Sequence, residues 1–117
     1  MVEMTVQIPE KLAARIGASG VWLPTIFELG LTLFRTKAAL TATELVSFLE
    51  TNPSPQDVLT YHASRRSHLR LERLLTLNEA NLLTEKEKQE LDEFENIEHL
   101  VVMLKAQAAK QLKQNKS

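Results

Sequence analysis

The sequence predicts a mainly α-helical protein, in which one short N-terminal β-strand precedes about five to six helices and the last helix is long. Apolar residues make up 44% of the 117 residues and aromatic residues only 5%, so aliphatic side chains must form the core. Leucine is the commonest of them, and leucine favours helices. Only three glycines and four prolines interrupt the chain, and its apolar residues recur mostly at helical spacing.

The N-terminal segment alternates between apolar and polar side chains. Positions 2, 4, 6 and 8 are apolar, whereas Glu3, Thr5 and Gln7 are polar. This period of two is typical of a half-buried strand, which Pro9 would end. No second strand pattern follows, and an unpaired strand would leave backbone groups without hydrogen bonds. We therefore expect two copies of the chain to form a homodimer by pairing these strands antiparallel.

Turn and capping residues predict where the helices begin and end. A first helix should follow Pro9 and close at Gly17. A second should begin at Pro24 and end at Arg35 and Lys37, whose charges suit the negative pole of the helix. Three later helix starts have candidate caps. These are Thr41 with Glu44, Ser54 before Pro55, and Thr84 with Glu87.

The C-terminal part predicts a helical hairpin. A polar, basic segment at 62–68 should link it to the preceding helices, and a leucine-rich helix should begin at Ser67 and end within 78–81. The long last helix carries a narrow apolar seam that should pack on other helices. The seam consists of Leu91, Phe94, Ile97, Val101, Leu104 and Ala108.

Composition excludes several classes of function. The chain has no cysteine, so disulfides, thiolate catalysis and cysteine-ligated zinc are excluded. It has no apolar run of 18 residues and no basic signal-peptide start, so we expect a cytoplasmic protein without a membrane span. No glycine-rich loop or nucleophile motif is evident. We expect neither an enzyme nor a cofactor.

Charge is distributed unevenly although its net value is only −1. Residues 65–73 carry four Arg and one Glu, a balance of +3, and residues 85–98 carry seven acids and two Lys, a balance of −5. Residues 105–116 carry four Lys and no acid, a balance of +4. Such a chain can offer separate faces to different partners.

The acidic segment allows two interpretations. Asp92, Glu95 and His99 stand at i, i+3 and i+7, a spacing that could contribute ligands to a metal. Alternatively, the carboxylates stabilise the positive start of the helix and solvate its outer face. Similarly, Arg66, Arg70 and Arg73 share one helix face, where they could contact phosphates, remain solvated or pair with the acidic segment.

The order strand, helix, helix resembles the ribbon-helix-helix family of DNA-binding proteins. The resemblance implies that the outward strand residues Glu3, Thr5 and Gln7 read base edges in the major groove. It also implies a phosphate contact at the L-P-T-I start of the second helix. The further candidate DNA-binding residues are Thr25 in that start, Arg35 and Lys37.

The segment from Leu83 to Ala108, L-T-E-K-E-K-Q-E-L-D-E-F-E-N-I-E-H-L-V-V-M-L-K-A-Q-A, resembles small bacterial proteins described as antitoxin components of toxin–antitoxin pairs. The resemblance implies that region 1–37 dimerises and binds operator DNA, that 38–63 connects, and that 64–117 binds and silences a partner toxin, expected to be nuclease-like. The candidate partner-binding residues are Arg66, Arg70, Arg73, Glu90, Asp92, Glu93 and Glu95. A structural adaptor homodimer and a small metal-binding protein are the alternatives.

Overall fold

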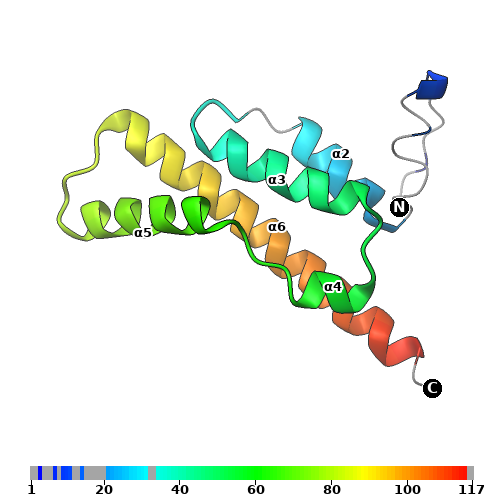
Figure 1. Ribbon diagram of the computed structural model, residues 1–117. Coiled ribbons are helices and arrows are strands. Elements are labelled where there is room, and N and C mark those ends of the chain that lie inside the picture. The colour runs from blue at the N-terminus through cyan, green and yellow to red at the C-terminus, as the bar shows by residue number, and fades with distance from the viewer. Residues whose placement is uncertain are drawn as a thin grey trace.

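The computed structural model describes residues 3, 7, 9–11, 14, 21–31 and 34–115. This part of the chain contains the five helices that Figure 1 labels. They are α2 (Leu23–Leu31), α3 (Ala38–Glu50), α4 (Pro55–Leu59), α5 (Arg65–Glu79) and α6 (Glu85–Asn115). The mainly helical class and the long last helix are confirmed. Most of the predicted strand, including Thr5, lies outside the described residues.

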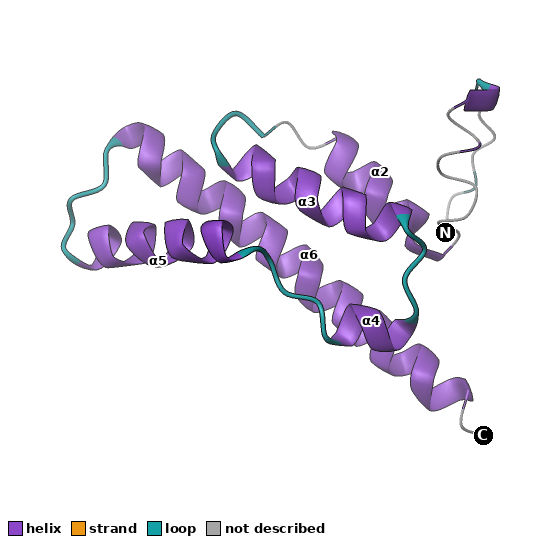
Figure 2. Ribbon diagram, in the orientation of Figure 1, coloured by secondary structure: helices purple, strands orange, loops and turns teal. Residues whose placement is uncertain are grey.

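Helix α6 is the element on which the others are assembled. Helices α3, α4 and α5 each pack against it, and α2 packs against α3. Figure 2 shows α5 alongside the N-terminal part of α6, with α4 crossing α6 further along. No helix in the described part is long and apolar enough to span a membrane.

The predicted apolar seam forms the spine of the core. Leu91, Phe94, Ile97, Leu104 and Ala108 are at most 5% exposed, and only Val101 is partly exposed. Burial of such side chains contributes roughly 1.5–3 kcal/mol each for the larger ones. The other elements contribute fully buried side chains to the same core, which are Trp22, Leu45, Leu49, Val58 and Leu74.

Two of the predicted caps are confirmed. The Ser54 hydroxyl accepts from the Asp57 amide at 3.1 Å, and Asp57 accepts back from the Ser54 amide, so a capping box starts α4. At α6, the Thr84 hydroxyl accepts from the Glu87 amide at 3.2 Å and Glu87 accepts from the Thr84 amide at 3.0 Å. Asn81 then has a φ of 59° in the turn between α5 and α6, as the predicted break there requires.

The predicted start of α3 is wrong, because Thr41 and Glu44 serve tertiary contacts instead of a capping box. Helix α3 begins at Ala38, whose amide donates to the Thr36 hydroxyl at 3.2 Å. Thr41 is buried inside the helix with its hydroxyl 2.6 Å from that of Ser67.

Two further boundaries differ from the prediction. Phe34 to Lys37 are not part of α2, so the basic pair does not lie at its C-terminal pole. Helix α5 begins at Arg65 and not at Ser67, because the Ser64 hydroxyl accepts from the Ser67 amide and caps the helix two residues earlier. The linker predicted at 62–68 is therefore shorter, because α5 already begins at Arg65.

Candidate functional site

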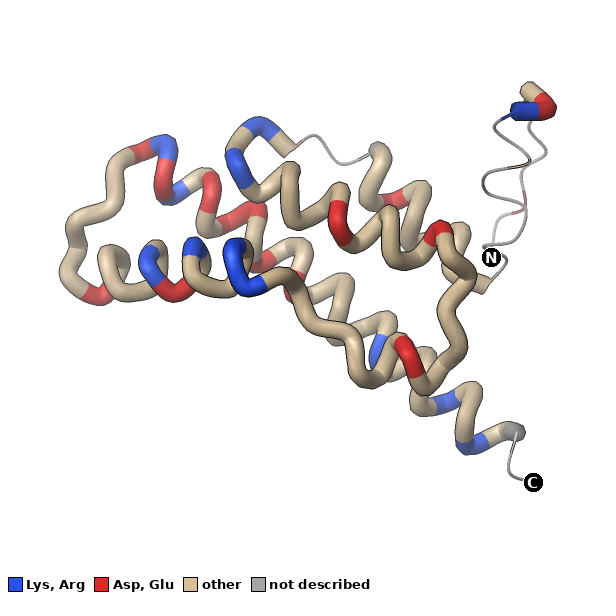
Figure 3. The backbone as a smooth tube through the Cα atoms, in the orientation of Figure 1, with Lys and Arg blue, Asp and Glu red and all other residues tan. Residues whose placement is uncertain are grey.

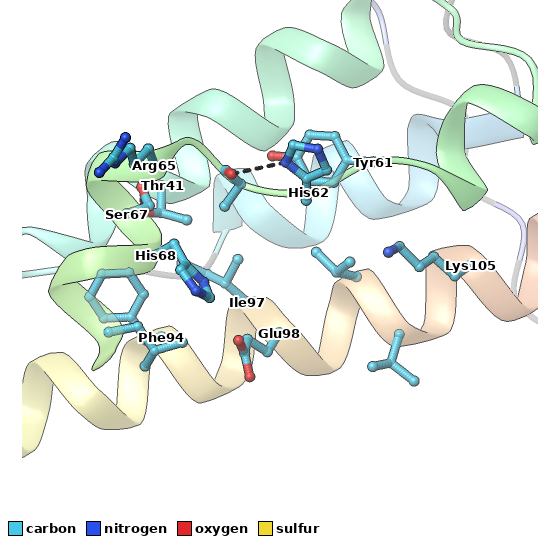
Figure 4. A pocket seen from close by; sticks show the side chains of 14 residues that line it. Thr41, Tyr61, His62, Arg65, Ser67, His68, Phe94, Ile97, Glu98 and Lys105 are labelled. Carbon is cyan, nitrogen blue, oxygen red and sulfur yellow. Dashed lines mark hydrogen bonds between the residues drawn. The ribbon is translucent and has the colours of Figure 1, made fainter. Parts of the chain in front are cut away.

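An open groove lies where α5 stops covering α6. Helix α5 begins at Arg65, and the chain before it, at 61–64, is non-helical and leads back to α4. Between this segment and the middle of α6, at 94–105, lies a cavity of about 680 Å³. Figure 4 shows His62, Arg65 and His68 on one side of the space and Phe94, Glu98 and Lys105 on the other.

The floor of the groove is apolar and continues the core seam outward. Leu71 contributes from α5, and Phe94, Ile97, Val101 and Val102 contribute from α6. Val102 is 64% exposed. Its neighbour Met103 is also exposed, at 54%, but does not line the groove. Val102 therefore adds an exposed apolar side chain to the edge of this floor.

The wall formed by the start of α5 is held in place by α3. The carboxylate of Glu44 accepts from the Ser64 amide at 3.2 Å, from the Ser64 hydroxyl at 2.9 Å and from the Ser67 hydroxyl at 3.2 Å. It also lies 3.5 Å from the guanidinium of Arg66. The Glu44 side chain therefore fixes the start of α5 beside the groove.

Tyr61 closes the same wall from the α4 side. Its ring packs on Phe48 with 4.5 Å between the centroids. Burial, and then the negative charge of Glu44, raise the pKa of the Tyr61 hydroxyl above its ordinary value. Further along, the indole of Trp22 donates to the Pro53 carbonyl at 3.0 Å and anchors α2 to the loop before α4.

The rim of the groove carries more positive than negative charge. Arg65 and Lys105 oppose the single carboxylate of Glu98. His68 is paired with Glu72 at 3.0 Å, and a ring nitrogen of His62 lies 3.4 Å from the Ala63 carbonyl (Figure 4). An apolar floor with a charged rim suits binding of an amphipathic segment.

The expectation that the acidic segment lies on an outer face is wrong for Glu90 and Glu93. Glu90 is 3% exposed and accepts from Arg70 through two hydrogen bonds, of 2.7 and 2.8 Å. This hydrogen bonding raises the pKa of Arg70. The pair joins α5 to α6, so the alternative that the arginines pair with the acidic segment is confirmed for Arg70.

Glu93 is also buried, but it contacts a different part of the chain. It is 7% exposed, and its carboxylate accepts from the amides of Arg35 and Thr36 at 3.1 Å and from the Thr36 hydroxyl at 2.8 Å. Gln89 donates to it as well, at 3.3 Å. Glu93 therefore holds the loop before α3 against α6, which explains why the chain is not helical there.

The remaining candidate partner-binding residues do not form one surface. Arg66 is paired with Glu44, and Arg73 is exposed on α5. Asp92 and Glu95 are exposed on α6 and are the only members of the acidic candidates that face solvent. With His99 they form no potential metal site, since the described residues hold no group of three suitable ligands.

The candidate DNA-binding residues are also separated. Thr25 is half-buried in the first turn of α2, whereas Arg35 and Lys37 are exposed beyond the last turn of that helix. Arg35 and Lys37 instead line a second cavity of about 570 Å³ together with Lys86 at the start of α6. Glu3 and Gln7 are exposed, and Thr5 lies outside the described residues.

Sequence reasoning missed the groove and the contribution of Lys86. The signal for the groove was present, because Val102 adjoins Val101 outside the narrow seam and so widens the apolar face in the C-terminal part of α6. Comparison of the chain with protein-family models, curated proteins and solved structures gives no match.

Proposed function

We propose that this chain is a non-enzymatic protein of the antitoxin type, which binds a partner toxin in the groove between 61–68 and α6 and so silences it. The groove is the observation that carries the proposal. It has an apolar floor, a polar rim and a volume of about 680 Å³ that no described segment of the chain fills. The resemblance of the segment 83–108 to antitoxin components supports the same function.

The energetics of the groove suit reversible binding of a protein. Covering an exposed valine or a comparable side chain contributes on the order of 1.5–3 kcal/mol. Val101, Val102 and Leu71 together would therefore supply several kcal/mol before ordering costs are subtracted. Because a binding free energy of about 4 kcal/mol corresponds to a Kd of only about 1 mM, contacts outside the floor must supply the rest of the affinity.

The exposed carboxylates of Asp92 and Glu95 give the partner a second contact. A toxin that acts on nucleic acid needs a basic surface, and two solvated carboxylates on α6 would attract it. Changing both to amides, as Asp92→Asn with Glu95→Gln, should lower the association rate more than it raises the dissociation rate. An unchanged association rate at low salt would remove this contact from the proposal.

The test of toxin binding uses two neighbouring exposed residues of α6. The full chain is co-expressed with the toxin-like product of the adjacent open reading frame, and co-purification and cell growth are measured. Val102→Asp should abolish co-purification and growth rescue, because it places a charge on the groove floor. Met103→Asp, with the same change outside the groove, should preserve both. Equal loss with both variants, or retention with both, would refute the groove as the binding site.

A second activity, contact with operator DNA by a homodimer, has support from the second cavity. Arg35, Lys37 and Lys86 line it beside the group of Arg70, Glu87 and Glu90, and none of these first three has an ion-pair partner among the described residues. Non-specific affinity for DNA comes from neutralising phosphates. A gel shift with the upstream DNA should therefore weaken about uniformly across sequences in a Lys37→Glu, Lys86→Glu variant. No shift of the unaltered chain at low salt would favour a structural adaptor instead.

A further inference from the structure

We infer that the second cavity, which lies at the start of α6, binds a nucleoside di- or triphosphate. The cations of this cavity are those of the proposed contact with DNA, so the inference rests on that proposal and specifies a ligand for the same site. Three properties of the cavity carry it, which are its origin in separate segments, its unbalanced charge and an exposed leucine beside the cations.

Segments that are far apart in the sequence converge on this cavity. The loop before α3 contributes Arg35 and Lys37, α5 contributes Arg70, and the start of α6 contributes Lys86. Figure 3 shows basic residues in that loop and at the start of α6. The cavity volume of about 570 Å³ lies within the range of roughly 300–1,000 Å³ that is typical of small-ligand sites. A small ligand can therefore meet cations from more than one segment at once.

The loop that carries two of these cations is already held in place by the protein itself. The Glu93 carboxylate accepts from the amides of Arg35 and Thr36, each at 3.1 Å, and from the Thr36 hydroxyl at 2.8 Å. These contacts fix the backbone of the loop, whereas the side chains of Arg35 and Lys37 remain exposed. Ligand binding then has to order side chains and not the loop, which favours affinity.

The charge of the cavity is positive and incompletely balanced. Four cations and two carboxylates line it, a balance of +2. Both carboxylates are engaged, because Glu90 accepts two hydrogen bonds from Arg70, and Glu87 accepts from the Thr84 amide at 3.0 Å. The other three cations have no ion-pair partner in the part of the chain that the structure describes. An anion with at least two negative charges would balance the site.

Linked phosphate groups match these cations better than a single carboxylate does. The guanidinium of Arg35 offers a planar fork of donors that fits two phosphate oxygens, and the two lysines act as point charges. Lys86 lies in the first turn of α6, near the positive pole of that helix, which adds to the attraction. A di- or triphosphate carries enough charge to balance the site and presents several oxygens to cations on separate segments.

An exposed apolar side chain beside the cations favours a nucleotide over inorganic phosphate. Leu40, in the first turn of α3, is 52% exposed and lines the cavity together with Ala39. A base or sugar that covers Leu40 would remove apolar surface from water, which is favourable. In duplex DNA the faces of the bases are stacked on one another. A free nucleotide can therefore combine this apolar contact with phosphate contacts, whereas a duplex cannot.

The experiment is isothermal titration calorimetry of the full chain with ATP, pyrophosphate and orthophosphate at low salt. We expect ATP to bind most tightly and orthophosphate about tenfold more weakly, because each exposed cation that a ligand engages contributes a few-fold. The double variant Lys37→Glu, Lys86→Glu should lower the affinity for ATP by about tenfold or more. Leu40→Ser should weaken ATP by about threefold, since it removes most of the apolar contact, and should leave the affinity for pyrophosphate unchanged.

A matched control carries the same change of charge outside the cavity. The double variant Lys110→Glu, Lys113→Glu alters two exposed lysines in the C-terminal part of α6 that do not line the cavity, and it should leave the affinity for ATP unchanged. Circular dichroism of every variant checks that its helices are intact. Equal losses in the two double variants would show that affinity follows net charge alone and would overturn the site. Equal affinities for ATP and pyrophosphate would overturn the nucleotide as its ligand.

Two outcomes separate this inference from the proposed contact with DNA. If ATP fails to bind while the gel shift of the upstream DNA still weakens in the Lys37→Glu, Lys86→Glu variant, the nucleotide site is refuted and the DNA contact stands. If ATP binds as expected but the upstream DNA gives no shift at low salt, the DNA contact is refuted and the nucleotide site stands.

Discussion

The buried pair of Arg70 and Glu90 should respond unequally to removal of its two members. The Glu90 side chain is 4% exposed, whereas that of Arg70 is 27% exposed and also lies 4.0 Å from Glu87. Arg70→Met leaves a carboxylate enclosed in protein without a partner, which costs about 3–5 kcal/mol in comparable pairs. We expect about 3 kcal/mol, because partial exposure of the site lets some water reach it.

The opposite change should cost much less. Glu90→Leu leaves the arginine with Glu87 and with access to water, so we expect a loss of about 1 kcal/mol. The double variant removes both charges. Its free energy of unfolding should lie within about 1 kcal/mol of that of the unaltered chain, since buried pairs are often replaceable by apolar residues. Urea unfolding followed by circular dichroism at 222 nm measures all three. The reasoning fails if Arg70→Met costs no more than Glu90→Leu, or if the double variant loses the sum of the two.

Three further predictions concern side chains that join elements of the fold. Glu93→Ala should destabilise the chain by about 2 kcal/mol, because the Arg35 and Thr36 amides both donate to this carboxylate. It should also speed hydrogen exchange of these two amides, which NMR can follow. Slow exchange of both amides in the variant would contradict this role of Glu93. Trp22→Phe should cost about 1–2 kcal/mol in urea unfolding, because it leaves the buried Pro53 carbonyl without its donor. The single tyrosine should ionise above its ordinary value near 10 in an absorbance titration. Because its folded pKa is the higher one, its contribution to stability is complete below the unfolded pKa and is lost as the pH rises through the folded pKa.

Local signals in the sequence identified the features of the fold that depend on neighbouring residues. The caps at Ser54 and Thr84 were found because each hydrogen bond joins residues three apart. The apolar seam of α6 was found because periodicity alone places its side chains on one face.

Features that depend on distant partners could not be found in this way. Thr41 with Glu44 has the same spacing as Thr84 with Glu87, but its side chains bond to residues 20–26 positions away and not to each other. The burial of Glu93 likewise follows from amides 57 and 58 positions earlier.

The groove likewise depends on residues that are far apart in the sequence. It exists because α5 begins at Arg65 and the non-helical segment 61–64 leads back to α4, so that Val102 on α6 stays exposed between them. Neither hydrophobic periodicity nor charge counting shows where one helix stops covering another. The exposed valine at 102 was the one local sign, and it gains its meaning only from the position of α5.

The most direct measurement of the central claim is methyl NMR of the full chain with and without the partner protein. Val102 and Met103 are adjacent and both exposed, but only Val102 lines the groove. The account predicts that the partner shifts the methyl signals of Val101 and Val102 and leaves that of Met103 almost unchanged. Shifts of Met103 with unchanged signals from both valines would contradict binding in the groove.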